Sequence, residues 1–392
     1  MKEVILIKEG EIFLKGLNKK TFEAILIRNI KTSLKNLGQF TILKEQSTIT
    51  IVPEENFNLD LAIKKISRVF GIACFSRALT VKKNFEEIKK SCKEYLKKEL
   101  EIKKSFKVSA KRSDKSFQLS SPSICEKLGE FLLEEFKNLH VDLKNPEINV
   151  SVEIRDSFSY IHHKTIKGAG GVPVKSAGDA MLLLSGGIDS PVAGWMMAKR
   201  GLKICATHFI SPPYTGERAL KKVKDLVLIL EEWTGKIPLF IVNTTKLQEE
   251  IKKNCPGNLL TIILRRAMLK IAEKISLNQK ENNNKNIKAL ITGESLSQVA
   301  SQTIAAIDCT NKATSMPILR PLIGMDKDEI VEIAKKINSF KTSILPYEDC
   351  CSIFSPKHPK TNPKLYEILN AEKKINLEEL IDFSVKNAEL KI

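Results

Sequence analysis

The chain has 392 residues, 42% of them hydrophobic, and a formal net charge of +18. This length allows two or three domains, each with an apolar core. No apolar run reaches the roughly 18 residues of a membrane-spanning helix, and the charged N-terminus lacks the pattern of a signal peptide, so no membrane partner is expected. The basic charge favours a nucleic-acid partner, although a lysine-rich surface that only confers solubility has the same composition.

The eight cysteines are sparse and form no C-x-x-C pair. This pattern argues against a disulfide framework or a zinc site and favours the reducing cytoplasm. We therefore predict a cytoplasmic protein and assign no metal-ligating residues.

The beginning of the chain has the pattern of a small α+β unit. Residues 2–7 (KEVILI) and 48–52 (TITIV) have the composition of strands. Between them, Asn18 is predicted to cap a helix that runs to about residue 38, and a second helix is expected over 59–70.

The next hundred residues continue with helices and short strands. Helical spacing is found at 84–100 and 122–136, and strand alternation at 106–112 (FKVSAKR) and 148–156. Basic residues gather where the strand at 106–112 ends. Three of them are candidates for contacts with RNA, although a solvated surface is the alternative for any single one: Lys111, Arg112 and Lys115.

A glycine-rich stretch at 164–180 (KTIKGAGGVPVKSAGDA) separates two patterns, and we expect no regular element in it. Beyond it, short continuous apolar runs alternate with helical stretches. These runs are MLLLS, KICATHF, PLFIVN and KALIT. Continuous runs are typical of strands covered on both faces, so the second half predicts an α/β domain with a doubly wound parallel sheet.

The sequence SGGIDSP (185–191) follows the first strand of that domain, at the edge where such sheets bind ligands. Gly186 and Gly187 would let backbone N–H groups approach an anion, and Ser185 and Ser190 add hydroxyl donors. The N-terminus of the following helix would also favour a phosphate. Neither the Walker A pattern nor the dinucleotide pattern G-x-G-x-x-G is present at this loop.

Asp189 distinguishes this loop, since a carboxylate repels phosphates unless a cation lies between them. A helix N-cap is the non-catalytic alternative. The pattern S-G-G-x-D-S after an apolar strand resembles the PP-loop of the ATP pyrophosphatases, which cleave ATP between the α and β phosphates. The resemblance implies ATP and Mg²⁺ as cofactors and a catalytic role for Asp189.

The resemblance extends to one family over nearly the whole chain. Seven stretches resemble, in order and spacing, the ThiI family of tRNA sulfurtransferases, the tRNA 4-thiouridine synthetases: KEGEIFLKGLNKKTFE (8–23), FKVSAKRSDKSF (106–117), KGAGGVPV (167–174), SGGIDSPVAG (185–194), GESLSQVASQT (293–303), RPLIGMDKDEI (320–330) and LPYEDCCSIF (345–354). Val172 and Lys175 differ from the residues usual in the family.

The family implies a fold that combines α+β and α/β domains. These are an N-terminal ferredoxin-like domain (1–58), a THUMP RNA-binding domain (59–166) and, after a linker (167–178), a PP-loop ATP pyrophosphatase domain (179–392). We expect no rhodanese domain.

The family also implies an activity and partners. The activity is ATP-dependent transfer of sulfur from a cysteine persulfide to uridine 8 of tRNA, by adenylation of uracil O4 and displacement of AMP. Family members also pass sulfur to a small carrier protein in thiamine thiazole synthesis. The implied partners are tRNA, a cysteine desulfurase, a sulfur-carrier protein and a second copy in a homodimer.

The sulfur-bearing cysteine of the family aligns best with Cys350, and Cys351 is the adjacent alternative. Two buried, small apolar residues would be the non-catalytic interpretation. Cys205 is expected in the core, with a resolving role as its alternative. Residues 265–269 (RRAML) stand about where some relatives carry a C-x-x-C, so we expect no iron–sulfur cluster.

The resemblance also carries over the nucleotide contacts, which fall at strand ends and on helices of the last domain: Leu183, Leu184, Ser185, Gly186, Gly187, Asp189, Ser190, His208, Phe209, Arg265, Gly293 and Gln302. A core histidine is the alternative for His208, and a surface arginine for Arg265.

Lys327 is the remaining catalytic candidate. It lies in the first turn of a helix for which Asp326 and Glu329 predict a capping box. A lysine there opposes the helix dipole, which a nearby anion would explain. The family places a functional lysine at this position, and a solvated lysine is the alternative.

Two other functions stay open. One is another PP-loop enzyme, which thiolates a different base or adenylates a small acid. The other is a non-catalytic tRNA-binding protein with a decayed loop. The basic first half and the Cys350 region argue against the small acid, and the intact SGGIDS argues against decay.

Overall fold

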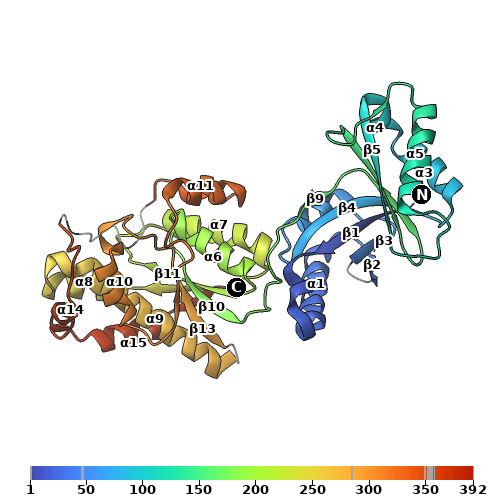
Figure 1. Ribbon diagram of the computed structural model, residues 1–392. Coiled ribbons are helices and arrows are strands. Elements are labelled where there is room, and N and C mark those ends of the chain that lie inside the picture. The colour runs from blue at the N-terminus through green and yellow to red at the C-terminus, as the bar shows by residue number, and fades with distance from the viewer. Residues whose placement is uncertain are drawn as a thin grey trace. The chain divides into compact units, whose positions relative to one another are not determined.

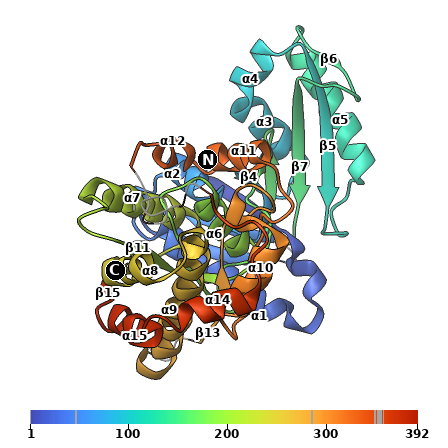
Figure 2. The same ribbon diagram turned by 90° about the vertical axis from the view of Figure 1, so that its left-hand side faces the viewer.

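The computed structural model describes residues 2–45, 48–283, 286–347, 350, 356 and 358–391 (Figures 1 and 2). The chain forms two compact units, Met1–Gly171 and Val172–Ile392. Within the described ranges, no helix is both long enough and apolar enough to cross a membrane.

The first unit is built on a nine-stranded sheet with the order β2-β3-β1-β4-β8-β7-β5-β6, in which β9 also pairs with β4. Its strands are β1 (Lys2–Glu9), β2 (Phe40–Glu45), β3 (Thr48–Pro53), β4 (Ile72–Val81), β5 (Ser105–Arg112), β6 (His140–Val141), β7 (Ile148–Ile154), β8 (Ser159–His162) and β9 (Ile166–Lys167). Its helices are the 3-10 helix η1 (Glu11–Asn18), α1 (Lys19–Leu34), α2 (Leu59–Ile66), α3 (Phe85–Tyr95), α4 (Lys97–Ile102) and α5 (Ser121–Glu135).

The first half of this sheet has the ferredoxin-like order of elements, β1-α1-β2-β3-α2-β4, as predicted. Leu26 of α1 and Ala62 of α2 pack in one core with Ile5 and Ile51 of the sheet. Because α2 shares this core, we assign it to the ferredoxin-like part, although the sequence boundary at residues 58 and 59 placed it in the next domain.

The second half of the sheet carries α3 and α5 on a separate core, which contains Cys92, Leu128 and Val150. Figure 2 shows α5 alongside β5 and β7. The helix predicted over 84–100 is divided into α3 and α4, because Leu96 leaves helical geometry with φ −103° and ψ 11°.

Two local predictions need correction. Asn18 does stand at the N-cap position of α1, as predicted, but its side chain makes no capping hydrogen bond, because it has φ −82° and ψ −3° at the end of η1. The glycine-rich stretch at 164–180 does contain a regular element, since β9 pairs with β4. The N–H of Gly168 donates to the carbonyl of Ala73 at 2.8 Å. A Cβ at Gly168 would lie 2.3 Å from the carbonyl oxygen of Ile72, so glycine permits this approach.

The second unit is built on a six-stranded sheet with the order β14-β13-β10-β11-β12-β15, parallel except for β15. Its strands are β10 (Asp179–Leu183), β11 (Lys203–Ile210), β12 (Leu239–Asn243), β13 (Ile287–Ile291), β14 (Ile318–Leu319) and β15 (Glu389–Lys391). Its helices are α6 (Asp189–Lys199), α7 (Glu217–Thr234), α8 (Thr245–Asn254), η2 (Gly257–Leu259), α9 (Leu260–Asn283), η3 (Ala300–Gln302), α10 (Ile304–Asn311), α11 (Lys327–Lys336), α12 (Phe340–Ser343), α14 (Leu365–Glu372) and α15 (Leu377–Lys386).

Helices cover both faces of this sheet, which confirms the predicted doubly wound α/β domain. In Figure 1, α6, α7 and α11 lie on one side of the strands, and α9 and α15 lie on the other. The chain proceeds from β10 to β11 and β12, then returns to place β13 on the other side of β10. This reversal forms a topological switch point beside β10, where doubly wound sheets bind ligands.

Candidate active site

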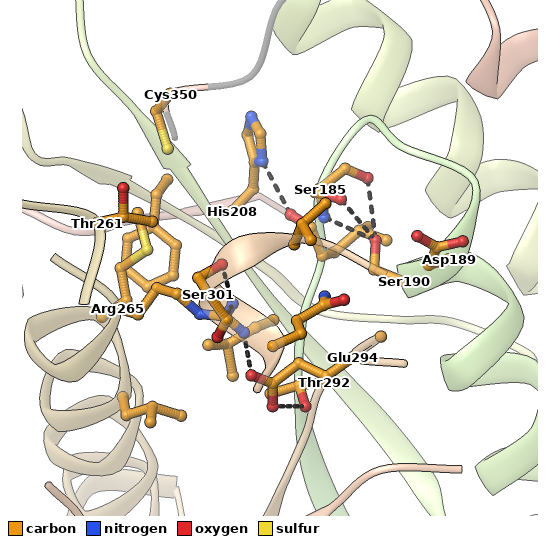
Figure 3. A pocket seen from close by; sticks show the side chains of 18 of the residues that line it. Ser185, Asp189, Ser190, His208, Thr261, Arg265, Thr292, Glu294, Ser301 and Cys350 are labelled. Carbon is orange, nitrogen blue, oxygen red and sulfur yellow. Dashed lines mark hydrogen bonds and ion pairs between the residues drawn. The ribbon is translucent and has the colours of Figure 1, made fainter. Parts of the chain in front are cut away.

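A cavity of about 430 Å³ lies at this switch point, at the carboxyl ends of β10, β11 and β13 (Figure 3). Its volume is in the range of small-molecule sites. It is lined by Leu183, Leu184, Ser185, Asp189, Ser190, His208, Phe209, Thr261, Arg265, Met268, Leu269, Thr292, Gly293, Glu294, Gln298, Val299, Ser301, Gln302 and Cys350.

The lining brings together most of the predicted nucleotide contacts and the predicted sulfur-bearing Cys350. Gly186 and Gly187 belong to the same loop but are not part of the lining. Lys327 is not part of it either, but it contacts Asp189, which is.

The loop between β10 and α6 is braced by its own serines. The N–H of Ser185 donates to Oγ of Ser190 at 2.9 Å, and the two hydroxyls lie 3.0 Å apart. The N–H of Gly187 donates to Oγ of Ser185 at 3.3 Å. The hydroxyls that we expected as anion donors therefore also fix the shape of the loop.

Gly293 lets this loop pack directly on the end of β13. A Cβ at Gly293 would lie 2.7 Å from the backbone nitrogen of Ser190 and 2.8 Å from the carbonyl carbon of Asp189. Backbone atoms cannot move aside as a flexible side chain can. This close approach explains a glycine at Gly293 on steric grounds alone.

Asp189 is held from two sides. The ammonium of Lys327 lies 2.6 Å from its Oδ1, and the amide of Gln298 donates to its Oδ2 at 2.9 Å. Asp189 is the first residue of α6 and follows Ile188 at the N-cap position, so the N-cap alternative for Asp189 is wrong.

Lys327 lies in the first turn of α11, where a positive charge is unfavourable unless an anion is close. The capping box of Asp326 and Glu329 is present, as predicted. The anion that offsets the helix dipole at Lys327 is Asp189, and the side chain of Lys327 is 45% exposed, so it is both paired and solvated.

Arg265 approaches the cavity from α9 and forms an ion pair with Glu294 (Figure 3). Its guanidinium also donates to Oγ of Ser301 at 2.9 Å, and its side chain is 20% exposed, so the surface alternative is wrong. Arg320 donates to the second oxygen of Glu294 at 2.5 Å. Burial would raise the pKa of Glu294, but the charges of Arg265 and Arg320 outweigh it and hold that pKa below its usual value.

His208 combines both interpretations given for it. It is 4% exposed and its Nδ1 lies 2.9 Å from the carbonyl oxygen of Leu184, so it fixes the end of β10. It also lines the cavity (Figure 3).

Gln302, on η3, has a polar atom available for a ligand. Its side chain is 9% exposed, and among the described residues its Oε1 has no hydrogen-bond partner. Oε1 of Gln248, which does not line the cavity, likewise has no described partner, so the lining position of Gln302 rather than its unpaired oxygen makes it a candidate for ligand contact.

Sequence reasoning missed Glu294, Gln298 and Arg320. Glu294 directly follows Gly293 at the end of β13, and Arg320 directly follows β14. Their places after two parallel strands were the available signal, but β14 has two residues and was not predicted.

Cys350 is 4% exposed, packs with the core that includes Met181, and lines the cavity. Figure 3 shows its side chain directed toward the other labelled residues. Cys351 lies outside the described residues. Cys205 is 1% exposed in β11, so it lies in the core. In the other unit, burial raises the pKa of the Cys92 thiol to about 12, which disfavours a reactive thiolate at Cys92.

The RNA candidates lie at the end of β5 in the first unit. Lys111 and Lys115 are exposed. The guanidinium of Arg112 donates to the carbonyls of Phe117 and Leu119 at 3.0 and 3.1 Å, so Arg112 also shapes the loop that carries Lys115.

Comparisons with known proteins cover the whole chain. The family described as "Thiamine biosynthesis protein (ThiI)" matches residues 175–377, the "ThiI ferredoxin-like domain" matches 4–76, and the THUMP domain matches 82–163. A probable tRNA sulfurtransferase of Acetivibrio thermocellus is 50% identical over 100% of this chain and 98% of its own. A second, from Alkaliphilus metalliredigens, is 44% identical over 100% and 98%. The crystal structure of a 4-thiouridine synthetase in complex with RNA and ATP has a TM-score of 0.90 and 39% identity, over 100% of this chain and 99% of its own.

Proposed function

Because this chain belongs to the ThiI family and is a tRNA sulfurtransferase, we propose that it uses ATP to transfer sulfur from a persulfide on Cys350 to uridine 8 of tRNA. The observation that carries the proposal is the shared cavity, in which Cys350 and the Asp189 loop line one space. The related synthetase that was crystallised with RNA and ATP supports both substrates.

The residues of the cavity fit ATP. The loop of residues 185–187 would lie against the phosphates, with the N-terminus of α6 behind it. The unpartnered Oε1 of Gln302 would accept a hydrogen bond from the nucleotide. Lys327 would stabilise the charge that develops on the leaving pyrophosphate.

Asp189 would hold Mg²⁺, because it is a carboxylate on the loop itself and each of its oxygens accepts only one hydrogen bond from a described residue. The ion, when bound, would neutralise phosphate charge.

The reaction then follows in three steps. Uracil O4 attacks the α phosphate of ATP and pyrophosphate leaves, while the base loses its N3 proton. The terminal sulfur of the Cys350 persulfide attacks C4 and AMP leaves, which joins the base to Cys350 through a disulfide. A second thiol attacks the sulfur of Cys350, so 4-thiouridine is released and the two thiols become a disulfide, which a reductant must reopen.

The burial of Cys350 suits the second of these steps. An adenylated base is an activated electrophile that water would hydrolyse. Cys350 is 4% exposed, so its persulfide would attack from a side of the cavity that water reaches poorly. We therefore infer that the closed position of Cys350 favours thiolation over hydrolysis.

Further parts of the proposal rest on the family alone. A separate cysteine desulfurase would load Cys350, a second copy would complete a homodimer, and Lys111 and Lys115 would contact the tRNA. Transfer of sulfur to a carrier protein for thiamine synthesis is a second candidate function, which the match to the family of thiamine biosynthesis proteins favours.

The test combines unmodified tRNA, ATP, Mg²⁺ and a small persulfide donor, with 4-thiouridine followed by its near-ultraviolet absorbance. Equal amounts of thiouridine, AMP and pyrophosphate are expected. Cys350→Ala should abolish thiouridine, and Cys92→Ala, at a buried cysteine of the other unit, should not. Cys351→Ala should also retain it.

Other outcomes point to the alternatives. Pyrophosphate released with no thiouridine at uridine 8 would indicate a different acceptor for the PP-loop chemistry. Binding of tRNA with no ATP cleavage would indicate a non-catalytic protein. Product that survives in Cys350→Ala and is lost in Cys351→Ala would move the persulfide to the neighbouring cysteine.

A further inference from the structure

Lys222 is a buried lysine on a helix whose other lysines are exposed. It lies in α7 and is 5% exposed, whereas Lys221 and Lys224 on the same helix are exposed. An ammonium group is costly to bury unless its donors are bound. The hydrogen bonds of Lys222 must therefore offset the cost of burying its ammonium group.

Two of those contacts are backbone carbonyls of the segment that leads to Cys350. Nζ of Lys222 donates to the carbonyl oxygen of Leu345 at 2.8 Å and to that of Tyr347 at 3.4 Å. Tyr347 precedes Cys350 by three positions in the sequence. Lys222 therefore ties the approach to Cys350 to a helix of the central fold.

Apolar burial does not hold this segment. The side chains of Ile344 and Leu345 are 54% and 41% exposed. The short helix α12, which precedes them, does pack on α7, so the segment starts close to Lys222. The carbonyl of Leu345 also accepts from the N–H of Tyr347 at 2.8 Å, and Lys222 supplies the charged donor that joins both carbonyls to α7.

We propose that Lys222 is a positioning residue for sulfur transfer: it fixes residues 345–347 and thereby sets where Cys350 enters the cavity. The consequence for the reaction rests on the proposed function, but the effect on Cys350 itself does not. A displacement of about 1 Å at a reacting atom can lower a rate about 100-fold, so a small movement of this segment is enough.

The test compares Lys222→Met, which keeps the length of the side chain and removes its donors, with Lys222→Arg, which restores donors. Lys224→Met on the same helix is the matched control. Lys222→Met leaves the carbonyls of Leu345 and Tyr347 without their charged donor, at a cost in stability, so a thermal melt must first show that this variant folds. The first readout is alkylation of Cys350 by iodoacetamide, measured in a Cys351→Ala background by mass spectrometry of the peptide that contains Cys350.

We expect Lys222→Met to change the alkylation rate of Cys350 at least about threefold. The rate of thiolation in a single turnover should fall at least about tenfold, while the Kd for ATP should stay within about twofold of the wild-type value. Lys222→Arg should recover most of both, and Lys224→Met should match the wild type. Because alkylation needs neither tRNA nor ATP, it decides the positioning role even if the wild type forms no thiouridine.

Two outcomes would overturn the proposal. One is Cys350 alkylation in Lys222→Met at the wild-type rate. The other is a loss of thiolation matched by an equal loss of ATP binding, which would indicate general damage to the domain. If Lys222→Met does not fold, Lys222→Arg must fold and keep the alkylation rate of Cys350, and failure of that variant overturns the proposal as well.

Discussion

A single methyl group at Gly293 should disable the nucleotide site. In Gly293→Ala the new Cβ would lie 2.7 to 2.9 Å from backbone atoms of Asp189 and Ser190. Those atoms begin α6, so the loop and the helix must shift together. Overpacking of this kind costs about 1–3 kcal/mol. Since about 1 kcal/mol lowers the Tm of a domain of this size by about 2–4 °C, we expect a decrease of about 2–12 °C.

Tryptophan fluorescence reports this change selectively. The chain has two tryptophans, Trp195 in α6 and Trp233 in α7, and their rings pack edge to face at 5.5 Å in the second unit. A thermal melt followed at these residues therefore records the domain that carries the site. The binding of ATP, measured by calorimetry, should weaken at least about tenfold because the loop no longer holds its shape.

Gly324→Ala is the matched control for Gly293→Ala. A Cβ at Gly324 meets no heavy atom within 4 Å, so neither Tm nor ATP affinity should decrease. If Gly293→Ala has the Tm and the ATP affinity of the wild type, the steric argument is wrong. The view that the loop must contact the end of β13 is then wrong as well. A loss of Tm with unchanged ATP affinity would separate packing from binding.

Three further predictions concern charged groups. Asp189→Asn should lower the rate of tRNA-dependent pyrophosphate release about 100-fold, because it removes the carboxylate that Lys327 contacts. The control is Asp308→Asn, in an exposed ion pair on α10, which should leave this rate unchanged. Burial raises the pKa of Glu153, but hydrogen bonding from His162 and the charge of Lys8 hold it well below its usual value. The ionised carboxylate of Glu153 therefore stabilises the fold at pH values above the pKa of Glu153 in the unfolded chain. This stabilisation is lost as the pH falls below about 5 toward the lower pKa of the folded state. Circular dichroism should therefore show a loss of folded protein in acid that is smaller in Glu153→Gln. Glu372→Gln leaves the 2%-exposed Arg266 without its carboxylate partner and should cost about 3 kcal/mol in the tryptophan-monitored melt, while the Kd for ATP is unchanged.

The catalytic domain was readable from the sequence because each step depended on local pattern. Continuous apolar runs predicted parallel strands, and the loop after the first of them predicted the switch point. The capping box at Asp326 and the misplaced Lys327 are also local signals. The partner of Lys327 was not readable, since Asp189 is 138 positions away and only the topology brings them together.

The first unit was harder for a physical reason that β4 illustrates. This ten-residue strand was missed because its pattern does not alternate simply. Phe75 packs in the ferredoxin-like core, and Leu79 packs in the core below α3 and α5. Arg77, between them, forms an ion pair with Glu3 of β1. Phe75, Arg77 and Leu79 share one face of β4, and the charged Arg77 interrupts the apolar pattern of that face where the two cores meet, so periodicity alone did not identify the strand.

Two buried polar side chains of the second unit, Arg266 and Gln302, differ in whether described residues satisfy their hydrogen bonds. Arg266 is satisfied from inside, by Glu372 and by the carbonyl of Cys309. Gln302 is buried to a similar degree and faces the cavity, yet its Oε1 has no partner among the described residues. Burial is costly in both cases, but at Gln302 the described residues supply no compensating donor. Arg266 and Glu372 are 106 positions apart, so this difference cannot be read from the sequence and appears only when each buried donor and acceptor is followed to its partner.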